Sequence, residues 1–150
     1  QVAREAAQKR LDTLEVLGGT VAATGPGVRI VIHDPQRKVT PEILLNCIEE
    51  LRDAGAEVME VNDRIRLVAS SWVSSGAGGL VVDNEAVQQP IVLDVIGDPQ
   101  TLAEASRFRG GLISTVEGSQ VGGRVELTSV DQVRIDAVVT PRAPRFARPA

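Results

Sequence analysis

Two apolar runs in this chain are each followed closely by the same kind of helix start. The run from Val28 to His33 precedes Thr40-Pro41-Glu42, and the run from Ile91 to Ile96 precedes Asp98-Pro99. A hydroxyl or carboxylate cap followed by proline is typical of the first residues of a helix. A largely apolar run of this length favours a buried strand. The repeated order of strand and then helix predicts two β-α-β passes.

The rest of the chain supplies additional short strands. Leu44, Cys47, Ile48 and Leu51 recur at helical spacing after the first helix start, so that helix has one apolar face. Further strands are predicted at residues 21–24, 57–61, 64–74 and 80–82, with a turn at 25–27 and a terminal hairpin of 121–128 and 132–139. We therefore predict an α+β fold over residues 18–140, a ferredoxin-like βαβ sandwich with extra β-hairpins and its helices on one face.

The two ends of the chain differ from this middle part. Residues 1–17 are helical in composition, and Ala7, Leu11 and Leu14 follow the spacing of a coiled-coil seam before Gly18-Gly19 ends the helix. A helix this short is marginal in water and needs a partner: its own domain, a second copy, or a longer helix upstream. We expect a homodimer through this helix. Residues 141–150 hold three prolines and three arginines without an acid, which predicts a mobile tail.

Composition excludes several classes of protein. The single cysteine and single histidine among 150 residues exclude a disulfide framework and a Cys/His zinc site within one chain. The net charge of −4 argues against a nucleic-acid partner. Aromatic residues make up only 2% of the chain, so the core must be aliphatic. No apolar run reaches the roughly 20 residues that span a bilayer, and no residue pattern calls for a cofactor or a metal.

Two features, His33 with its neighbours and Cys47, are candidates for catalytic chemistry. His33-Asp34 could serve a serine nucleophile in a hydrolase, but the chain has no Gly-x-Ser-x-Gly motif. Cys47 lies on an apolar helix stripe, which favours a buried structural thiol. The possible nucleophiles for His33 are four hydroxyls that lie close together in the sequence: Ser70, Ser71, Ser74 and Ser75.

A second candidate site follows the strand at 57–61. Arg64 and Arg66 lie two residues apart, so on a strand they share one face and could bind an anion beside Asn62. They could equally pair with local acids such as Glu60. The neighbouring carboxylates are expected to form a dispersed, solvated surface: Glu49, Glu50, Asp53, Glu57 and Glu60.

Three ordered stretches resemble a known bacterial family. They are Gly25-Pro26-Gly27-Val28 running on to His33-Asp34, Glu50-Leu51-Arg52-Asp53-Ala54-Gly55-Ala56-Glu57 running on to Asn62, and Val95-Ile96-Gly97-Asp98-Pro99-Gln100-Thr101-Leu102. Together, over about residues 11–140, they resemble the uncharacterised family called domain of unknown function eight hundred and eighty-one. The chain departs from the family pattern at Asp63, where glycine is usual, and at Ile91, where an aromatic residue is usual.

The resemblance implies an architecture and a place in the cell. Members of the family typically carry a membrane helix, then a coiled coil, then this domain outside the cytoplasm, and residues 1–17 would be the last turns of the coiled coil. Genes of the family often lie near cell-division and envelope genes, and no catalytic activity is established for it. We therefore expect a non-catalytic interaction domain of a single-pass membrane protein, in cell division or envelope assembly. The alternatives from the residues themselves are a sensor of small anions that uses Asn62, Arg64 and Arg66, and a hydrolase that uses His33.

Overall fold

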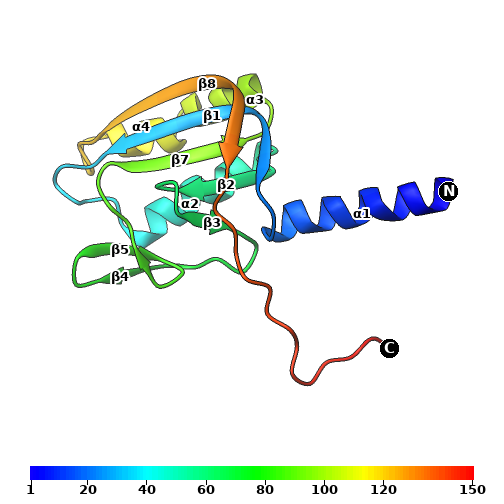
Figure 1. Ribbon diagram of the computed structural model, residues 1–150. Coiled ribbons are helices and arrows are strands. Elements are labelled where there is room, and N and C mark those ends of the chain that lie inside the picture. The colour runs from blue at the N-terminus through cyan, green and yellow to red at the C-terminus, as the bar shows by residue number, and fades with distance from the viewer.

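A five-stranded antiparallel sheet forms the centre of the structure, a computed structural model that describes all residues from 1 to 150 (Figure 1). Its strands are β1 (Ala23–His33), β2 (Val58–Val61), β3 (Ile65–Leu67), β7 (Ile91–Ile96) and β8 (Arg124–Ile135), in the spatial order β3-β2-β7-β1-β8. Helix α2 (Pro41–Asp53) connects β1 to β2, while α3 (Pro99–Arg107) and α4 (Leu112–Glu117) connect β7 to β8. The prediction of an α+β fold is confirmed, and β2-β7-β1-β8 with its two helical crossovers has the ferredoxin-like order.

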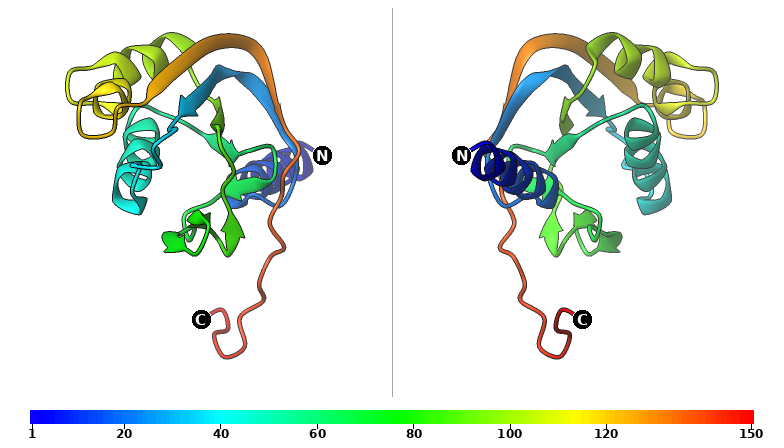
Figure 2. Two further views of the ribbon diagram at one scale, coloured as in Figure 1. Left: turned by 90° about the vertical axis from the view of Figure 1, so that its left-hand side faces the viewer. Right: turned by 90° about the vertical axis from the view of Figure 1, so that its right-hand side faces the viewer.

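The main core lies between this sheet and the helices α2, α3 and α4, which all cover the same face (Figure 2). Alternate residues of the interior strand β1 point into this core, and Val28, Ile30 and Ile32 are completely buried. The caps expected from the sequence are present. Thr40 accepts a hydrogen bond from the Ile43 backbone amide at 3.2 Å, and Asp98 accepts one from the Thr101 amide at 2.9 Å.

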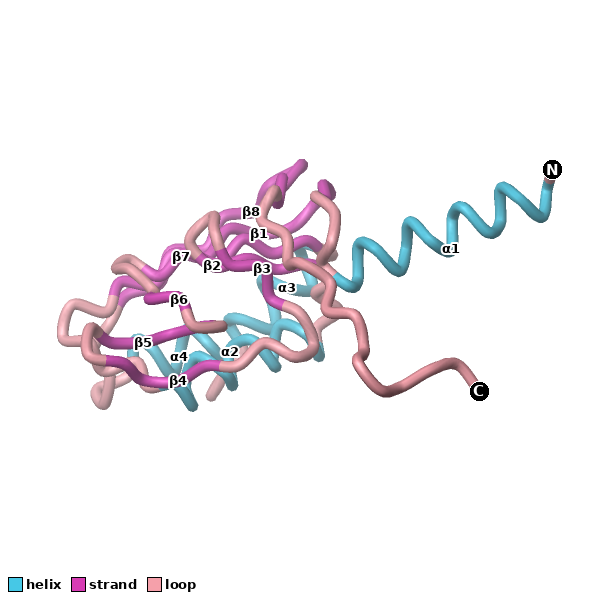
Figure 3. The backbone as a smooth tube through the Cα atoms, turned by 60° about the horizontal axis from the view of Figure 1, so that its bottom comes forward, coloured by secondary structure: helices cyan, strands magenta, loops and turns pink.

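A second, smaller antiparallel sheet lies beside α2 (Figure 3). It consists of β4 (Val73–Gly76), β5 (Gly79–Val82) and β6 (Glu85–Ala86). Leu80 and Val82 of β5 extend the main core under the end of the large sheet. These strands are among the extra hairpins expected from the sequence.

Two predicted turns are absent from the structure. The expected terminal hairpin is a single strand, β8, and the expected turn at 25–27 lies within the continuous strand β1. The two strands pair along nearly their whole length, with one irregularity where Gly25 pairs with Val133 but Gly27 pairs with Val130. Two residues of β8 therefore oppose Pro26 alone, which is a β-bulge. The turn-forming residues bend the strand pair here and do not reverse it.

The bend carries the start of β1 and the end of β8 over the face of the sheet that the helices leave uncovered. A small apolar cluster lies beneath them, with Ile96 of β7 and Val58 of β2 packed against Val133 and Ile135 of β8 and Ala23 of β1. Val16, near the end of the N-terminal helix, packs against the same cluster. This face is thus closed at one end and open at the other.

The N-terminal helix α1 (Val2–Gly18) projects from the body of the molecule (Figures 1 and 2). It ends as expected, at Gly19 with a left-handed φ of 80°. None of its residues is buried, and Leu11 and Leu14 are 49% and 62% exposed. None of the four helices combines the length and the apolar character that crossing a membrane requires. Residues 141–150 are exposed and belong to no helix or strand; their mobility stays a prediction.

Candidate functional site

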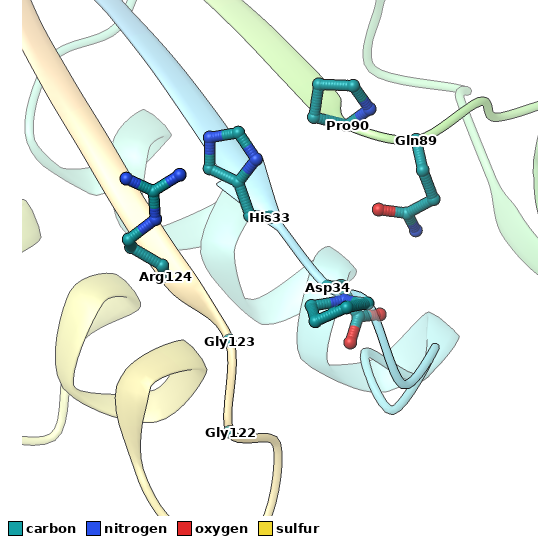
Figure 4. A pocket seen from close by; sticks show the side chains of 8 residues that line it. His33, Asp34, Gln89, Pro90, Gly122, Gly123 and Arg124 are labelled. Atoms are coloured by element: carbon teal, nitrogen blue, oxygen red, sulfur yellow. The ribbon is translucent and has the colours of Figure 1, made fainter.

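A polar cavity of about 450 Å³ lies where β1 ends and β8 begins (Figure 4). We call it the strand-end cavity. His33 and Arg124 enter it from paired positions of the two strands, and Gln89 faces them from the segment before β7. Its full lining has no large apolar side chain: His33, Asp34, Pro35, Gln89, Pro90, Gly122, Gly123 and Arg124.

The two basic side chains of this cavity meet one carboxylate. His33 Nε2 lies 3.3 Å from Glu126 Oε2, and Arg124 Nη1 lies 3.2 Å from Glu126 Oε1. His33 forms no hydrogen bond with a serine; the Ser71 hydroxyl instead donates to Asp83 at 2.8 Å. The structure therefore does not assemble the nucleophile that the hydrolase hypothesis needs beside His33.

Asp34, the neighbour of His33, is occupied by the backbone. Its side chain is buried, and its two oxygens accept hydrogen bonds from the amides of Lys38 and Val39, each at 2.9 Å. This closes the loop that leads to the Thr40 cap of α2. Because both oxygens of Asp34 are used, the residue shapes the loop beside the cavity.

The structure does not place Asn62, Arg64 and Arg66 together on one strand face. Asn62 adopts a left-handed φ of 53° in the turn after β2, donates from Nδ2 to the Gln88 carbonyl at 2.9 Å and accepts from the Val92 amide at 2.8 Å. Arg64 lies in the same turn, half exposed and 3.9 Å from Glu85. Only Arg66 belongs to β3, because the turn takes up the residues from 62 to 64. The two arginines thus do not share a strand face.

Arg66 is almost fully buried, with 2% of its surface exposed. Its guanidinium donates to three backbone carbonyls, those of Val16 at 2.8 Å and of Val21 and Ala137 at 2.9 Å each. These carbonyls belong to the end of α1, the link to β1 and the segment that follows β8. Arg66 therefore joins three parts of the chain and does not face solvent.

A row of charged side chains crosses the face of the sheet that the helices leave uncovered. Arg29 of β1 pairs in register with Asp94 of β7, Asp94 with Glu60 of β2, and Glu60 with Arg66 of β3. Arg29 Nη1 contacts both oxygens of Asp94, at 3.0 and 3.1 Å. The sequence pattern predicts a solvated position for Glu60 and no role for Asp94, but both side chains are buried. Each acid interrupts an otherwise apolar strand, which is the signal that could have identified them.

Burial changes the acid–base properties of this row. Burial raises the pKa of Glu60 to about 7. A hydrogen bond from the Ala137 amide lowers this pKa, while the negative charges of nearby carboxylates, Asp94 first, raise it further. Burial likewise raises the pKa of Asp94, while Arg29 lowers it. Two carboxyls that are both harder to ionise than usual therefore lie side by side in the middle of the sheet.

The acidic cluster also has the spacing of a metal site. Ligand oxygens of Glu60, Asp63 and Asp94 lie within 4.8 Å of one another, an arrangement that suits a hard divalent cation. Arg29 already provides a positive charge there, since its guanidinium binds Asp94 and lies 3.9 Å from Asp63. We therefore interpret the cluster as a set of carboxylates whose ion pairs centre on Arg29.

Cys47 lies in the core face of α2, as its place on the apolar helix stripe predicts. Its side chain is 3% exposed. Burial, followed by the nearby charge of Glu50, raises the pKa of the thiol to about 12. A thiol that does not ionise in the physiological range is a poor nucleophile, so Cys47 serves packing.

Comparisons with known proteins place this arrangement among uncharacterised bacterial proteins. Residues 10–148 match the model of a family described as bacterial protein of unknown function, DUF881. UPF0749 proteins of Mycobacterium bovis and Mycobacterium tuberculosis are each 41% identical over 152 residues, which is 99% of this chain and 51% of the relative. The chain therefore spans about half the length of these curated relatives.

The fold also has a solved counterpart. A crystal structure of an uncharacterized conserved protein from Mycobacterium tuberculosis superposes with a TM-score of 0.84 at 40% identity. The match covers 94% of this chain and 99% of that one. The likeness thus extends over nearly the whole molecule.

Proposed function

We propose that this chain, which belongs to the bacterial DUF881 family of unknown function, is a non-catalytic interaction domain of a longer protein and associates with a second copy through α1. One observation carries the proposal. Helix α1 exposes all three of its leucines, yet its last turn is bound to the sheet by the buried Arg66. A helix that is anchored at one end and uncovered elsewhere is suited to bind another helix.

The exposed side chains of α1 support this mode of association. Leu11, Leu14 and Leu17 are each about half exposed or more, and a helix of 17 residues is marginal in water unless an apolar face is covered. Ala7, Leu11 and Leu14 have the spacing at which two helices pack as a coiled coil. A second copy offers the same seam, so the two helices are self-complementary about a twofold axis.

Sedimentation of the protein over a range of concentrations tests this association. Leu11→Glu with Leu14→Glu places two negative charges in the seam and should convert a dimer into a monomer. Lys9→Glu is the matched control, because it also changes the charge by −2 but lies outside the seam; it should leave the dimer unchanged. A strict monomer for the full-length protein would refute the proposal.

The proposal extends to the site of action: the parent protein is membrane-anchored, with this domain on the extracytoplasmic side. The family resemblance supports this placement, and the relatives have about twice the length of this chain. In intact cells, the full-length protein should sediment with membranes, and this domain should be cleaved by added protease. Recovery in the soluble cytoplasmic fraction would contradict the placement.

A role in cell division or envelope assembly is the most specific part of the proposal and also rests on the resemblance. Crosslinking in intact membranes should then capture division or envelope proteins, and depletion should alter septation or envelope integrity. Full physiological function of a His33→Ala protein would support the absence of catalysis, whereas its loss in a folded variant would favour the hydrolase alternative.

The second candidate function is the sensing of a small anion, and the strand-end cavity favours it. His33 and Arg124 both contact the carboxylate of Glu126. A small anion could replace the Glu126 carboxylate in these two contacts. Inorganic phosphate and acetate are suitable probes, and binding would raise the melting temperature by mass action. Arg124→Ala should abolish that shift, while Arg109→Ala, away from the cavity, should preserve it. No shift with either probe would argue against this function.

A further inference from the structure

Three separate parts of the chain meet on the outer face of β2 and β3. The end of α1, the link between α1 and β1, and the segment after β8 each present one backbone carbonyl to Arg66. The Val139 amide also donates to the Gly19 carbonyl at 2.8 Å, which ties the last segment to the cap of α1. We call this meeting point the Arg66 junction.

Glu60 lies at the base of the junction without a full set of partners. It is paired with Arg66 in the register of β2 and β3, and it is 2% exposed. The hydrogen bonds of the Arg66 guanidinium go to carbonyls and not to Glu60. Glu60 itself accepts one long hydrogen bond, from the Ala137 amide at 3.4 Å. Its carboxyl group is therefore buried and receives little hydrogen bonding from the protein.

The charges around Glu60 are mostly negative. Arg66 of β3 faces it directly, and Arg29 of β1 acts on it through Asp94. The acids that face it come from the neighbouring strand, the β2–β3 turn and the segment after β8: Asp94, Asp63 and Asp136. Each of them opposes ionisation of Glu60, which adds to the effect of burial.

We infer that Glu60 is a proton-operated latch: in its protonated form it lets residues 136–139 and the end of α1 close over the sheet, and loss of the proton loosens them. The latch controls how firmly α1 is attached to the domain. It is thus a property of the fold beyond the proposed association, and it holds for one copy as well as for two.

The direction of the effect follows from proton linkage. The pKa of Glu60 is about 7 when the junction is closed and near its usual value of 4.5 when the junction opens to water. The closed form binds the proton more tightly, so its extra stability is complete below the lower pKa and is lost as pH rises through the higher one. Opening should become on the order of 10- to 100-fold more frequent between about pH 5 and pH 8.

Hydrogen exchange measures this opening. The amides of Ala137 and Val139 close the junction and should lose protection by that factor from pH 5 to pH 8, after correction for the intrinsic exchange rates. The amide of Leu51, in the core helix α2, is the internal reference and should change much less. Glu60→Gln imitates the protonated form and should remove the pH dependence. The control Glu57→Gln, at an exposed position just before β2, should keep it.

Two results would overturn the latch. One is protection of Ala137 and Val139 that does not fall with pH in the wild-type protein, or that falls equally in Glu60→Gln. The other is an NMR titration in which the Glu60 carboxyl of the folded wild-type protein ionises near 4.5, a measurement that needs no variant. Neither result would affect the sedimentation test, because the seam of α1 does not include the junction.

Discussion

Arg66 and Arg64 show how much position matters for one residue type. They are two residues apart in the sequence, yet Arg66 is 2% exposed and binds three carbonyls, whereas Arg64 is half exposed and lies 3.9 Å from Glu85. Exposed ion pairs at that distance contribute little to stability, while a buried charge that loses its partners is costly. The two residues therefore form a natural matched pair for mutation.

We predict that Arg66→Met lowers the free energy of unfolding by about 3–5 kcal/mol, because it leaves three carbonyls without donors and Glu60 without its nearest cation. Arg64→Met should change the free energy by less than about 0.5 kcal/mol. Urea unfolding of both variants followed by circular dichroism gives the comparison. Equal effects of the two substitutions would show that the burial of Arg66 has no energetic role.

The single cysteine permits a second prediction at this scale. Because the pKa of the buried Cys47 thiol is about 12, the folded protein should resist a thiol reagent at about pH 8, where a free thiol reacts readily. Addition of urea should make the reaction fast. Rapid labelling without denaturant would place Cys47 at an accessible position, in conflict with its packing on α2.

Strand β1 takes part in the longest strand pairing of the sheet, with β8, and also pairs with β7 on its other side. At Gly27 its backbone approaches β7 so closely that a Cβ atom would overlap the Val95 carbonyl oxygen. Pro26, at the bulge, provides the carbonyl that receives the Gly97 amide at 2.9 Å. The Gly-Pro-Gly stretch thus serves close strand packing at a bend.

We predict that Gly27→Ala destabilises the protein by at least ~2 kcal/mol, because neither backbone can move aside without breaking the pairing of β1 and β7. Gly18→Ala is the control: a Cβ atom there meets nothing within 4 Å and Gly18 belongs to helix α1. It should leave the melting temperature unchanged or raise it slightly. A neutral Gly27→Ala would mean that the strands separate more easily than this packing implies.

For the whole molecule, α1 and the domain are joined by few contacts in a small region. The helix buries no residue, but the carbonyls of Val16 and Val21 bind Arg66 and Val16 packs on the small cluster under β8. The exposed part of α1 can therefore bind a partner without lowering the free energy of unfolding of the domain. Only the last turn and the following link belong to both.

Two truncations test this division. Removal of residues 1–12 should change the free energy of unfolding by less than about 0.5 kcal/mol, because those residues have no buried contact. Removal of residues 1–22 should cost about 2 kcal/mol or more, since two charge-assisted hydrogen bonds of Arg66 are lost. Chemical denaturation of the two shortened proteins, compared at a concentration where both are monomeric, measures the difference.

Elements with local signals could be predicted from the residues alone. Cap-and-proline pairs at Thr40 and Asp98 start two helices, Gly19 ends another, and apolar runs form β1 and β7, because each signal acts through neighbouring backbone groups. The family likeness also rests on such local stretches. This was enough for the α+β fold and its helices on one face.

The meeting of polar residues, by contrast, depends on how the strands pair in three dimensions. Glu60, Asp94 and Arg29 come from three strands far apart in the sequence, and their row exists because long-range pairing sets the register. The turn at Asn62 and Asp63, with φ of 53° and 57°, includes Arg64, so Arg64 does not belong to β3. Arg66 does belong to β3, and it is covered by the end of α1 and the segment after β8. Local signals carry no information on such pairings, because register and burial depend on segments that meet only when the sheet has formed.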